Sequence, residues 1–287
     1  MPDTKTLITV AHSPDSDDAF MHYALAEGKI PTGDIEFRHV LQDIETLNKR
    51  AAEGTYEVTA LSVHAYAYLA DKYALLPHGA SMGEGGEEGY GPRLIARAPF
   101  TPEEAKGKTV AIPGKLTSAY LTLKLWAPDI EVTEMPFDEI LPAVAEGRVD
   151  CGLLIHEGQL TYPDAKVYLV ADLGVWWGEQ TGGLPLPLGG NAIRRDLEPA
   201  LQHEVSHLLR ESIRYALDHR EEALTYALQF ARGMEEQRHL ADQFVGMYVN
   251  DRTLDYNADA RRSVQLFLDR GHEAGVIPHH VQVVFAD

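Results

Sequence analysis

The sequence predicts an α/β fold of two lobes, with mixed, mainly parallel sheets and flanking helices. Over the first two thirds of the chain, short apolar segments alternate with segments of helical spacing, which is typical of βαβ units. The last third has helical spacing almost throughout and is expected to pack onto sheets formed earlier. At 287 residues the chain is long enough for one large domain or two lobes.

Alternating or continuous apolar runs, bounded by turn residues, predict the strands. The expected strands are 6–12, 35–40, 56–61, 94–98, 109–112, 132–135, 151–155 and 167–172. Apolar residues at helical spacing after capping side chains predict the helices. The expected helices are 18–27, 44–53, 63–73, 120–126, 137–146, 201–219, 221–231, 235–249 and 258–274.

We expect lobe 1 to comprise residues 1–94 and 189–287, and lobe 2 residues 95–188. The chain would cross between them near 92–98 and 184–194, and two such crossings form a hinge beside an inter-lobe cleft, a common place for small ligands. Segment 79–91 has six glycines and three glutamates and matches no phosphate-binding glycine pattern. It predicts a mobile surface loop.

Composition narrows the possible partners. Hydrophobic residues at 45% and charged residues at 24% are ordinary for a soluble globular protein. The net charge of −19 argues against nucleic acid or an anionic membrane, because phosphate backbones require basic patches. No stretch approaches the roughly 20 apolar residues of a membrane span, and the N-terminal apolar run is too short for a signal peptide. We expect a cytoplasmic monomer or homodimer that binds a small-molecule carboxylate.

His156 is the candidate catalytic base. It directly follows the expected strand 151–155, and in open α/β sheets ligands gather outside the carboxyl ends of the strands. An unperturbed histidine has a pKa of about 6.5 and can accept a proton near neutral pH. The alternative is a histidine that is only held at a strand end by hydrogen bonds. Cys151, the single cysteine, is expected to be a small buried strand residue.

Hydroxyl or carboxylate side chains stand at three expected strand-to-helix junctions, at 13–18, 60–62 and 117–118. A helix N-terminus offers N–H donors and the positive end of the helix dipole, so it suits a carboxylate. Each junction alone is an ordinary N-cap, and their recurrence favours a carboxylate site. In the first junction we expect Asp17 or Asp18 to cap the helix, with a polar ligand contact as the second interpretation.

Some further side chains leave alternatives open. His12 with the aspartates of 15–18 lacks the spacing of an EF-hand or zinc site, so we expect no metal there. Trp176 and Trp177 either line the cleft or close a lobe. Tyr162 and Asp17 are candidate proton donors, and we expect the histidines at 279–280 to lie on the surface.

Seven segments, in consistent order along the chain, resemble the 1,4-dihydroxy-6-naphthoate synthases of the futalosine route to menaquinone. They are HSPDSDDAF, LQDIETLN, ALSVHAYA, PGKLTSAYLTLKL, GLLIHEGQLTYP, DLGVWWGEQTGGLPLPLGG and YALDHREEAL. IHEGQLTYP and the segment from the tryptophan pair to LPLPLG are the specific ones. The first loop departs from the commoner SPCPNDTF form, because Asp15, Ser16 and Asp17 stand where Cys, Pro and Asn are usual.

The resemblance implies a fold like that of type 2 periplasmic binding proteins, used by a cytoplasmic enzyme without metal or organic cofactor. It implies conversion of cyclic dehypoxanthine futalosine to 1,4-dihydroxy-6-naphthoate, with loss of the sugar-derived part. The family's proton acceptor falls on His156. Its ligand-contacting residues fall on Ala60, Leu61, Ser62, Thr117 and Ser118, and Asp17 is a further candidate contact.

Two other functions stay open. One is chorismate dehydratase, an enzyme of the same pathway and fold, and the other is a non-catalytic binding protein for a small carboxylate or oxyanion. IHEGQLTYP and the tryptophan segment favour the synthase. An interaction module has no repeat, coiled coil or basic patch to support it.

Overall fold

The computed structural model describes residues 5–86, 89–231 and 237–286, and the chain divides into two compact units. Unit 1 consists of Met1–Ser81, Gly189–Asn257 and Gln282–Asp287, and unit 2 of Met82–Leu188 and Ala258–Val281. This division differs from the expected one, because the first boundary lies at residue 81 and not near 94, and because 258–281 belong to unit 2. Helical spacing alone does not reveal which sheet a C-terminal helix will cover.

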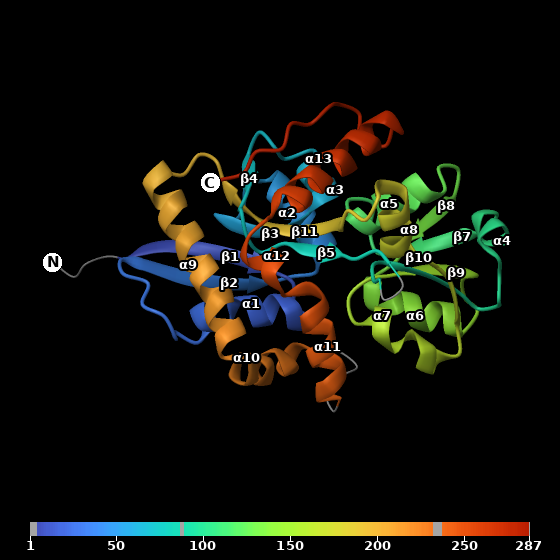
Figure 1. The fold of residues 1–287 in the computed structure, drawn as a ribbon, viewed down its shortest axis with the longest axis horizontal. Coiled ribbons are helices and arrows are strands. Elements are labelled where there is room, and N and C mark those ends of the chain that lie inside the picture. Colours follow the sequence, from blue (N-terminus) through green and yellow to red (C-terminus); the bar gives the residue numbers. More distant parts are fainter. Residues whose placement is uncertain (1–4, 87–88, 232–236, 287) are drawn as a thin grey trace. The chain divides into compact units, whose positions relative to one another are not determined.

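Unit 1 is built on a sheet with strand order β2-β1-β3-β11-β4, to which β5 adds by pairing with β11 (Figure 1). β1 runs parallel to β2 and β3, whereas β11 runs antiparallel to β3 and β4. Two of the four boundaries between the units fall inside β5 and β11. The strands are β1 (Thr6–His12), β2 (Ile35–Leu41), β3 (Val58–Ser62), β4 (Tyr73–Leu75), β5 (Ser81–Gly83) and β11 (Leu186–Arg194).

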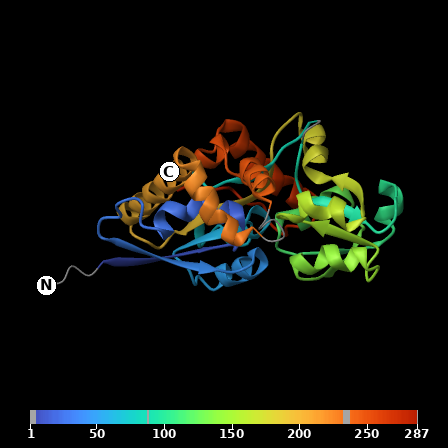
Figure 2. The ribbon, with the colours of Figure 1, turned by 90° about the horizontal axis from the view of Figure 1, so that it is seen from below.

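Helices cover both faces of this sheet (Figure 2). Val10 of β1 packs with Leu25 of α1 and Val205 of α9, whereas the next residue, Ala11, packs with Leu47 of α2, because successive strand residues point to opposite faces. The helices are α1 (Ser16–Ala26), α2 (Ile44–Ala52), α3 (Val63–Tyr66), α9 (Pro199–Asp218), α10 (Arg220–Ala227), the 3₁₀ helix η2 (Leu228–Phe230), α11 (Arg238–Tyr248) and α12 (Asp251–Leu254).

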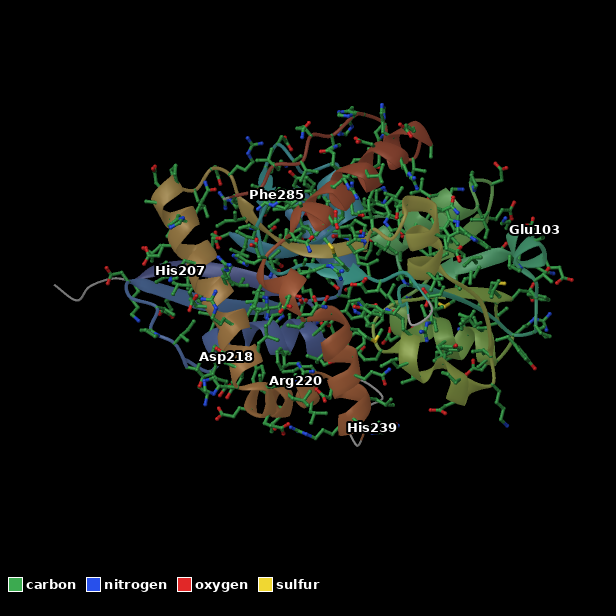
Figure 3. The ribbon with its side chains drawn as sticks, viewed as in Figure 1. Glu103, His207, Asp218, Arg220, His239 and Phe285 are labelled. Atoms are coloured by element: carbon green, nitrogen blue, oxygen red, sulfur yellow. The ribbon has the colours of Figure 1, made fainter. Side chains whose placement is uncertain are left out.

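Arg220 joins three helices of unit 1 (Figure 3). From the start of α10 its Nε and Nη2 donate to Asp242 Oδ1 of α11, at 2.9 and 2.6 Å. Its guanidinium also lies 5.5 Å from the centre of the Phe20 ring of α1. A single side chain therefore ties the helical layer together.

Unit 2 is built on a sheet with strand order β10-β6-β9-β7-β8. β7 runs parallel to β8 and β9, and β6 runs antiparallel to β9 and β10. The strands are β6 (Arg93–Ala96), β7 (Thr109–Ile112), β8 (Glu131–Glu134), β9 (Cys151–Leu154) and β10 (Tyr168–Asp172). The helices are α4 (Pro102–Lys106), α5 (Ser118–Trp126), α6 (Phe137–Ala145), α7 (Gly158–Thr161), the 3₁₀ helix η1 (Tyr162–Ala165), α8 (Leu173–Thr181) and α13 (Ala258–Glu273).

Two apolar clusters sandwich this second sheet. Leu153 of β9 belongs to the cluster that contains Leu123 of α5, whereas Leu154 belongs to the cluster that contains Ile140 and Val144 of α6. The alternation again follows from the strand period of two. None of the helices in the described part of the chain is both long and apolar enough to span a membrane.

Several predicted elements differ from those observed. The helix expected at 63–73 ends at Tyr66, and Tyr73 begins β4, where its hydroxyl donates to the carbonyl of Tyr56 at 2.8 Å. The segment after β10, for which no helix was expected, forms α8 with Asp172 as its N-cap. Part of the helix expected at 235–249 lies outside the described residues, and α11 begins at Arg238.

The glycine-rich segment 79–91 is not the surface loop that was expected. Its described residues are mostly buried or half-buried, and Glu84 and Tyr90 pair by two backbone hydrogen bonds of 2.8 and 2.9 Å. A Cβ on Gly85 would lie 2.8 Å from Gly178 Cα, and one on Gly91 would lie 2.5 Å from the nitrogen of Gly174. The glycines therefore allow close packing on α8.

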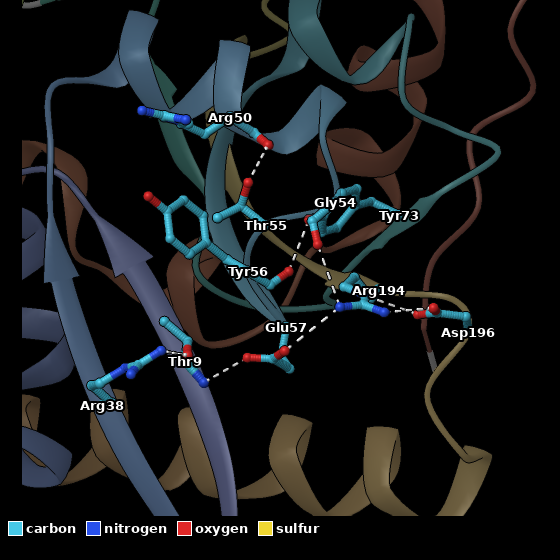
Figure 4. A network of polar contacts seen from close by, with 10 residues as sticks. All are labelled: Thr9, Arg38, Arg50, Gly54, Thr55, Tyr56, Glu57, Tyr73, Arg194 and Asp196. Carbon is cyan, nitrogen blue, oxygen red and sulfur yellow. Dashed lines mark hydrogen bonds and ion pairs between the residues drawn. The ribbon is translucent and has the colours of Figure 1, made fainter.

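A polar network fastens the strand ends of unit 1 (Figure 4). Glu57 precedes β3, and its Oε2 accepts from the buried Thr9 N–H of β1 at 2.9 Å. Its Oε1 lies 3.6 Å from Arg194 Nη1 of β11, and Arg194 also pairs with Asp196 at 2.6 Å. One carboxylate thereby links three strands of the sheet.

We predict that Glu57→Ala lowers the free energy of unfolding by about 1–3 kcal/mol, because the buried Thr9 N–H loses its acceptor. Glu53→Ala is the matched control, since it removes an exposed pair with Arg50, and should cost less than about 1 kcal/mol. Urea unfolding followed by circular dichroism measures both. Equal effects of the two substitutions would contradict this role of Glu57.

Three histidines stack in the interior of unit 1: His12 at the end of β1, His22 on α1 and His39 on β2. The centres of the His12 and His22 rings are 4.4 Å apart, and His12 Nε2 lies 3.2 Å from His39 Nδ1. Both ring nitrogens of His22 are buried without a hydrogen-bond partner among the described residues. Burial, followed by repulsion from neighbouring histidines, holds the pKa of His22 well below its usual range, and burial lowers the pKa values of His12 and His39 to about 4.

These lowered pKa values predict a loss of stability in acid. Above pH 6.5 the three rings are neutral in the folded and in the unfolded state. Below pH 6.5 the unfolded chain binds protons that the folded chain does not bind. The free energy of unfolding therefore decreases as the pH falls toward 4. Each such proton contributes a slope of about 1.4 kcal/mol per pH unit. His22→Leu should flatten the decline in melting temperature between pH 7 and 5.5, whereas His207→Leu, on an exposed face of α9, should not. An unchanged slope in His22→Leu would refute the assignment.

Candidate functional site

In both units, two successive strand–helix–strand connections lead to opposite sides of the same starting strand. In unit 1 the chain runs from β1 through α1 to β2, then through α2 to β3 on the other side of β1. In unit 2 it runs from β7 through α5 to β8, then through α6 to β9 on the other side of β7. Ligands of open α/β sheets bind outside the carboxyl ends of strands at such a switch point. These points lie between β1 and β3 and between β7 and β9.

Ser62, a candidate ligand contact, is the last residue of β3 at the switch point of unit 1. It occupies the N-cap position of α3, as expected, but its side chain makes no capping hydrogen bond. Instead Asn48 of α2 donates to Ser62 Oγ and accepts from Ser62 N, both at 3.0 Å. Asn48, which the sequence analysis did not single out, therefore fixes the orientation of the Ser62 hydroxyl.

The other two candidates on β3 have little exposed side chain. Ala60 is 7% exposed and Leu61 is fully buried. Their backbones lie opposite Asn191 and Gly190 of β11. Both residues thus contribute backbone pairing to the sheet, and Ser62 follows them at the carboxyl end of β3.

The loop after β1 is capped differently from the expectation that Asp17 or Asp18 caps the helix. Asp15 is the N-cap of α1, and its Oδ1 accepts from Asp18 N at 3.3 Å. Asp18 reaches back to accept from Ser13 N at 2.7 Å, and Asp17 is buried in the first turn. Three carboxylates already lie at this helix N-terminus, so it is poorly suited to a second anion.

Thr117 and Ser118 lie at the switch point of unit 2, after β7. Of Thr117 and Ser118, which were both candidate caps, Thr117 is the N-cap of α5, and its Oγ1 accepts from Tyr120 N at 3.2 Å and donates to the Gly114 carbonyl at 2.8 Å. Ser118 Oγ donates to the carbonyl of Leu188 at 2.5 Å. Both side chains are buried, and they lie at the positive end of the α5 helix dipole.

His156 follows β9, the strand beside β7. The carboxyl ends of these two parallel strands meet at one sheet edge, so His156 and Thr117 follow neighbouring strand ends. His156 has a φ of 53°, in the left-handed region that non-glycine residues rarely adopt and that occurs disproportionately at active sites. Its ring is half-buried, with the Phe137 ring of α6 edge-on at 5.0 Å between centres.

Other candidate side chains are structural. Trp177 is fully buried in unit 2, and its Nε1 donates to the Pro185 carbonyl at 3.1 Å and to Ser263 Oγ at 3.2 Å, so it closes the unit. Cys151 is buried in β9 as predicted, and burial raises the pKa of its thiol to about 11. The histidines at 279–280 are exposed, as predicted.

The loop aspartates and His12 do not form a metal site. His12 stacks on other histidines, and its Nδ1 lies 3.1 Å from the carbonyl of Ser13. Within the described ranges, no group of three histidine, cysteine or acidic side chains is arranged to hold a metal ion.

Comparisons with known proteins identify the family of this chain. A family model described as menaquinone biosynthesis matches residues 8–273. A 1,4-dihydroxy-6-naphtoate synthase of Thermus thermophilus is 40% identical over 257 residues, which cover 90% of this chain and 91% of that protein. A protein of the same name from Streptomyces coelicolor is 36% identical over 280 residues, covering 94% and 95%.

Solved structures establish the fold. A crystal structure of a protein from Archaeoglobus fulgidus matches with a TM-score of 0.88 and 47% identity, covering 94% of this chain and 98% of that one. The alkanesulfonate-binding protein SsuA of Xanthomonas axonopodis matches with a TM-score of 0.68 over 96% of both chains, at 17% identity. The second match shows the fold alone, that of periplasmic binding proteins. The match of the family model to nearly the whole chain, together with two relatives of at least 36% identity, shows that this chain belongs to the menaquinone biosynthesis family.

Proposed function

We propose that this chain is a 1,4-dihydroxy-6-naphthoate synthase, a cytoplasmic lyase that converts cyclic dehypoxanthine futalosine to 1,4-dihydroxy-6-naphthoate. The observation that carries the proposal is the placement of His156, which stands in a left-handed conformation at the carboxyl end of β9 and beside the strand that leads to Thr117. The two relatives named for this reaction support the choice of substrate.

In the proposed mechanism His156 is the base that removes a proton next to a carbonyl of the substrate. The electron pair of the resulting carbanion forms a new double bond while the carbon–carbon or carbon–oxygen bond to the sugar-derived part breaks. That part leaves with the electron pair of the broken bond and takes up a proton, and formation of the aromatic product supplies driving force. General-base catalysis typically contributes 10²–10⁴-fold. Positioning and electrostatic stabilisation of the developing charge must supply the rest of the acceleration.

Hydroxyls and backbone donors are proposed to hold the carboxylate substrate. Ser62 is oriented by Asn48, and the N-terminus of α5, capped by Thr117, provides the positive end of a nine-residue helix. Ser118 lies in the first turn of that helix. We assign Ala60 and Leu61 a supporting part, through the backbone. Asp17 is proposed as a polar contact to a neutral part of the substrate, because its charge disfavours a carboxylate neighbour.

Incubation of the purified chain with cyclic dehypoxanthine futalosine should yield 1,4-dihydroxy-6-naphthoate, detected by mass spectrometry without added cofactor. Chorismate, offered separately, should be recovered unchanged. Dehydration of chorismate would instead assign the chain to chorismate dehydratase. Recovery of both compounds unchanged, with one of them bound, would favour a binding protein.

We expect His156→Asn to lower kcat by at least about a hundredfold while substrate binding persists, because asparagine cannot accept the proton. Stopped assays give kcat, and calorimetric titration gives the dissociation constant. His207→Asn, at an exposed position of α9, serves as the control and should retain normal turnover (Figure 3). Near-normal turnover in His156→Asn would remove His156 from the mechanism.

A further inference from the structure

Arg93 is the first residue of β6, and it lies directly opposite Leu154, the last residue of β9, in the antiparallel pairing of the two strands. Leu154 is two residues before His156 in the chain. The side chain of Arg93 thus originates beside the point from which the candidate base leaves the sheet. No local pattern in the sequence marks this arginine.

The Arg93 guanidinium makes two contacts with the segment that follows His156. Its Nη1 donates to the carbonyl of Gln159 in α7. Its guanidinium carbon lies 5.4 Å from the centre of the Tyr162 ring in η1, a cation–π distance. The turn that begins at His156 is therefore held on one side by strand pairing at Leu154 and on the other by the guanidinium.

The guanidinium is itself fixed by Asp172. Arg93 Nε donates to Asp172 Oδ2 at 3.1 Å, and the two side chains are 19% and 10% exposed. Asp172 Oδ1 at the same time accepts from Gly174 N at 3.0 Å and Val175 N at 3.2 Å, as the N-cap of α8. The carboxylate therefore cannot rotate away without uncapping a helix, and this keeps the arginine in one orientation.

We propose that Arg93, held by Asp172, is a positioning residue that keeps His156 in its left-handed conformation and the Tyr162 ring against the Arg93 guanidinium. A non-glycine residue in this conformation is strained, and it persists only where its surroundings hold it there. The Arg93 guanidinium holds the turn from outside, through its contacts with Gln159 and Tyr162. This inference rests on the role proposed above for His156.

The test compares Arg93→Met with Arg97→Met. Arg97 follows the other end of β6 and pairs with Asp150 at 2.6 Å, but it is half exposed and far along the strand from the turn. Arg93→Met should lower kcat at least about tenfold and change KM by less than about threefold, because the base is misplaced and the binding groups are not. Arg97→Met should leave both constants unchanged.

A double variant separates positioning from a general loss of stability. If Arg93 acts through His156, then Arg93→Met combined with His156→Asn should be no slower than His156→Asn alone. Multiplying losses in the double variant would overturn the proposal. Asp172→Asn retains a capping oxygen but loses the charge that holds Arg93. It should therefore lower kcat as Arg93→Met does, by a smaller factor. This variant replaces Arg93→Met in the test if Arg93→Met does not fold.

Amide hydrogen exchange tests the same idea without any activity. In Arg93→Met the amides of residues 157–162 should exchange about tenfold faster than in the wild-type chain, and in Arg97→Met they should not. Unchanged exchange would overturn the proposal even if the wild-type chain converts the expected substrate. Faster exchange in a chain that does not convert that substrate would uphold the positioning role and reject the proposed reaction.

Discussion

The arrangement of both units depends on parallel strands whose carboxyl ends share one sheet edge. β1 with β3, and β7 with β9, are such pairs, and in each the connecting helices leave in opposite directions. The backbone N–H groups at the starts of the following helices cannot all find partners within the helix. A fold that repeats this geometry places backbone polar groups at fixed positions, and the side chains at the strand ends determine which ligand or reaction the site supports.

The candidate site residues of unit 2 differ in the contacts that fix their positions. Thr117 is fixed by hydrogen bonds that belong to its own helix cap, a device confined to a few neighbouring residues. His156 is held by groups distant in sequence, namely Phe137 of α6 and the strand pairing of β9 with β6. Capping hydrogen bonds between neighbouring residues can be recognised in a sequence, whereas contacts between residues far apart in the sequence cannot.

This difference explains what the sequence analysis could and could not predict. The strand ends at His12 and Ile112 were predicted, and the end at Leu154 was predicted one residue late, because each lies where a buried apolar run meets a polar turn. The helix expected at 63–73 was too long because Tyr73 pairs with Arg194, a partner more than a hundred residues away. α8, which begins at Leu173, was not predicted because its glycines and tryptophans are weak helix formers.

The last described residues of the chain return to unit 1. Leu75 N donates to the carbonyl of Val284 at 2.9 Å, and Ala286 N donates to the carbonyl of Leu75 at 2.8 Å, so a strand begun early is completed by the final residues. Unit 2 likewise receives α13 only after residue 258. During synthesis, unit 2 cannot acquire all of these contacts until residue 281 has left the ribosome, and unit 1 cannot until residue 286 has left it. Until then a partly made chain exposes apolar sheet faces, and such surface is prone to aggregation unless a chaperone covers it.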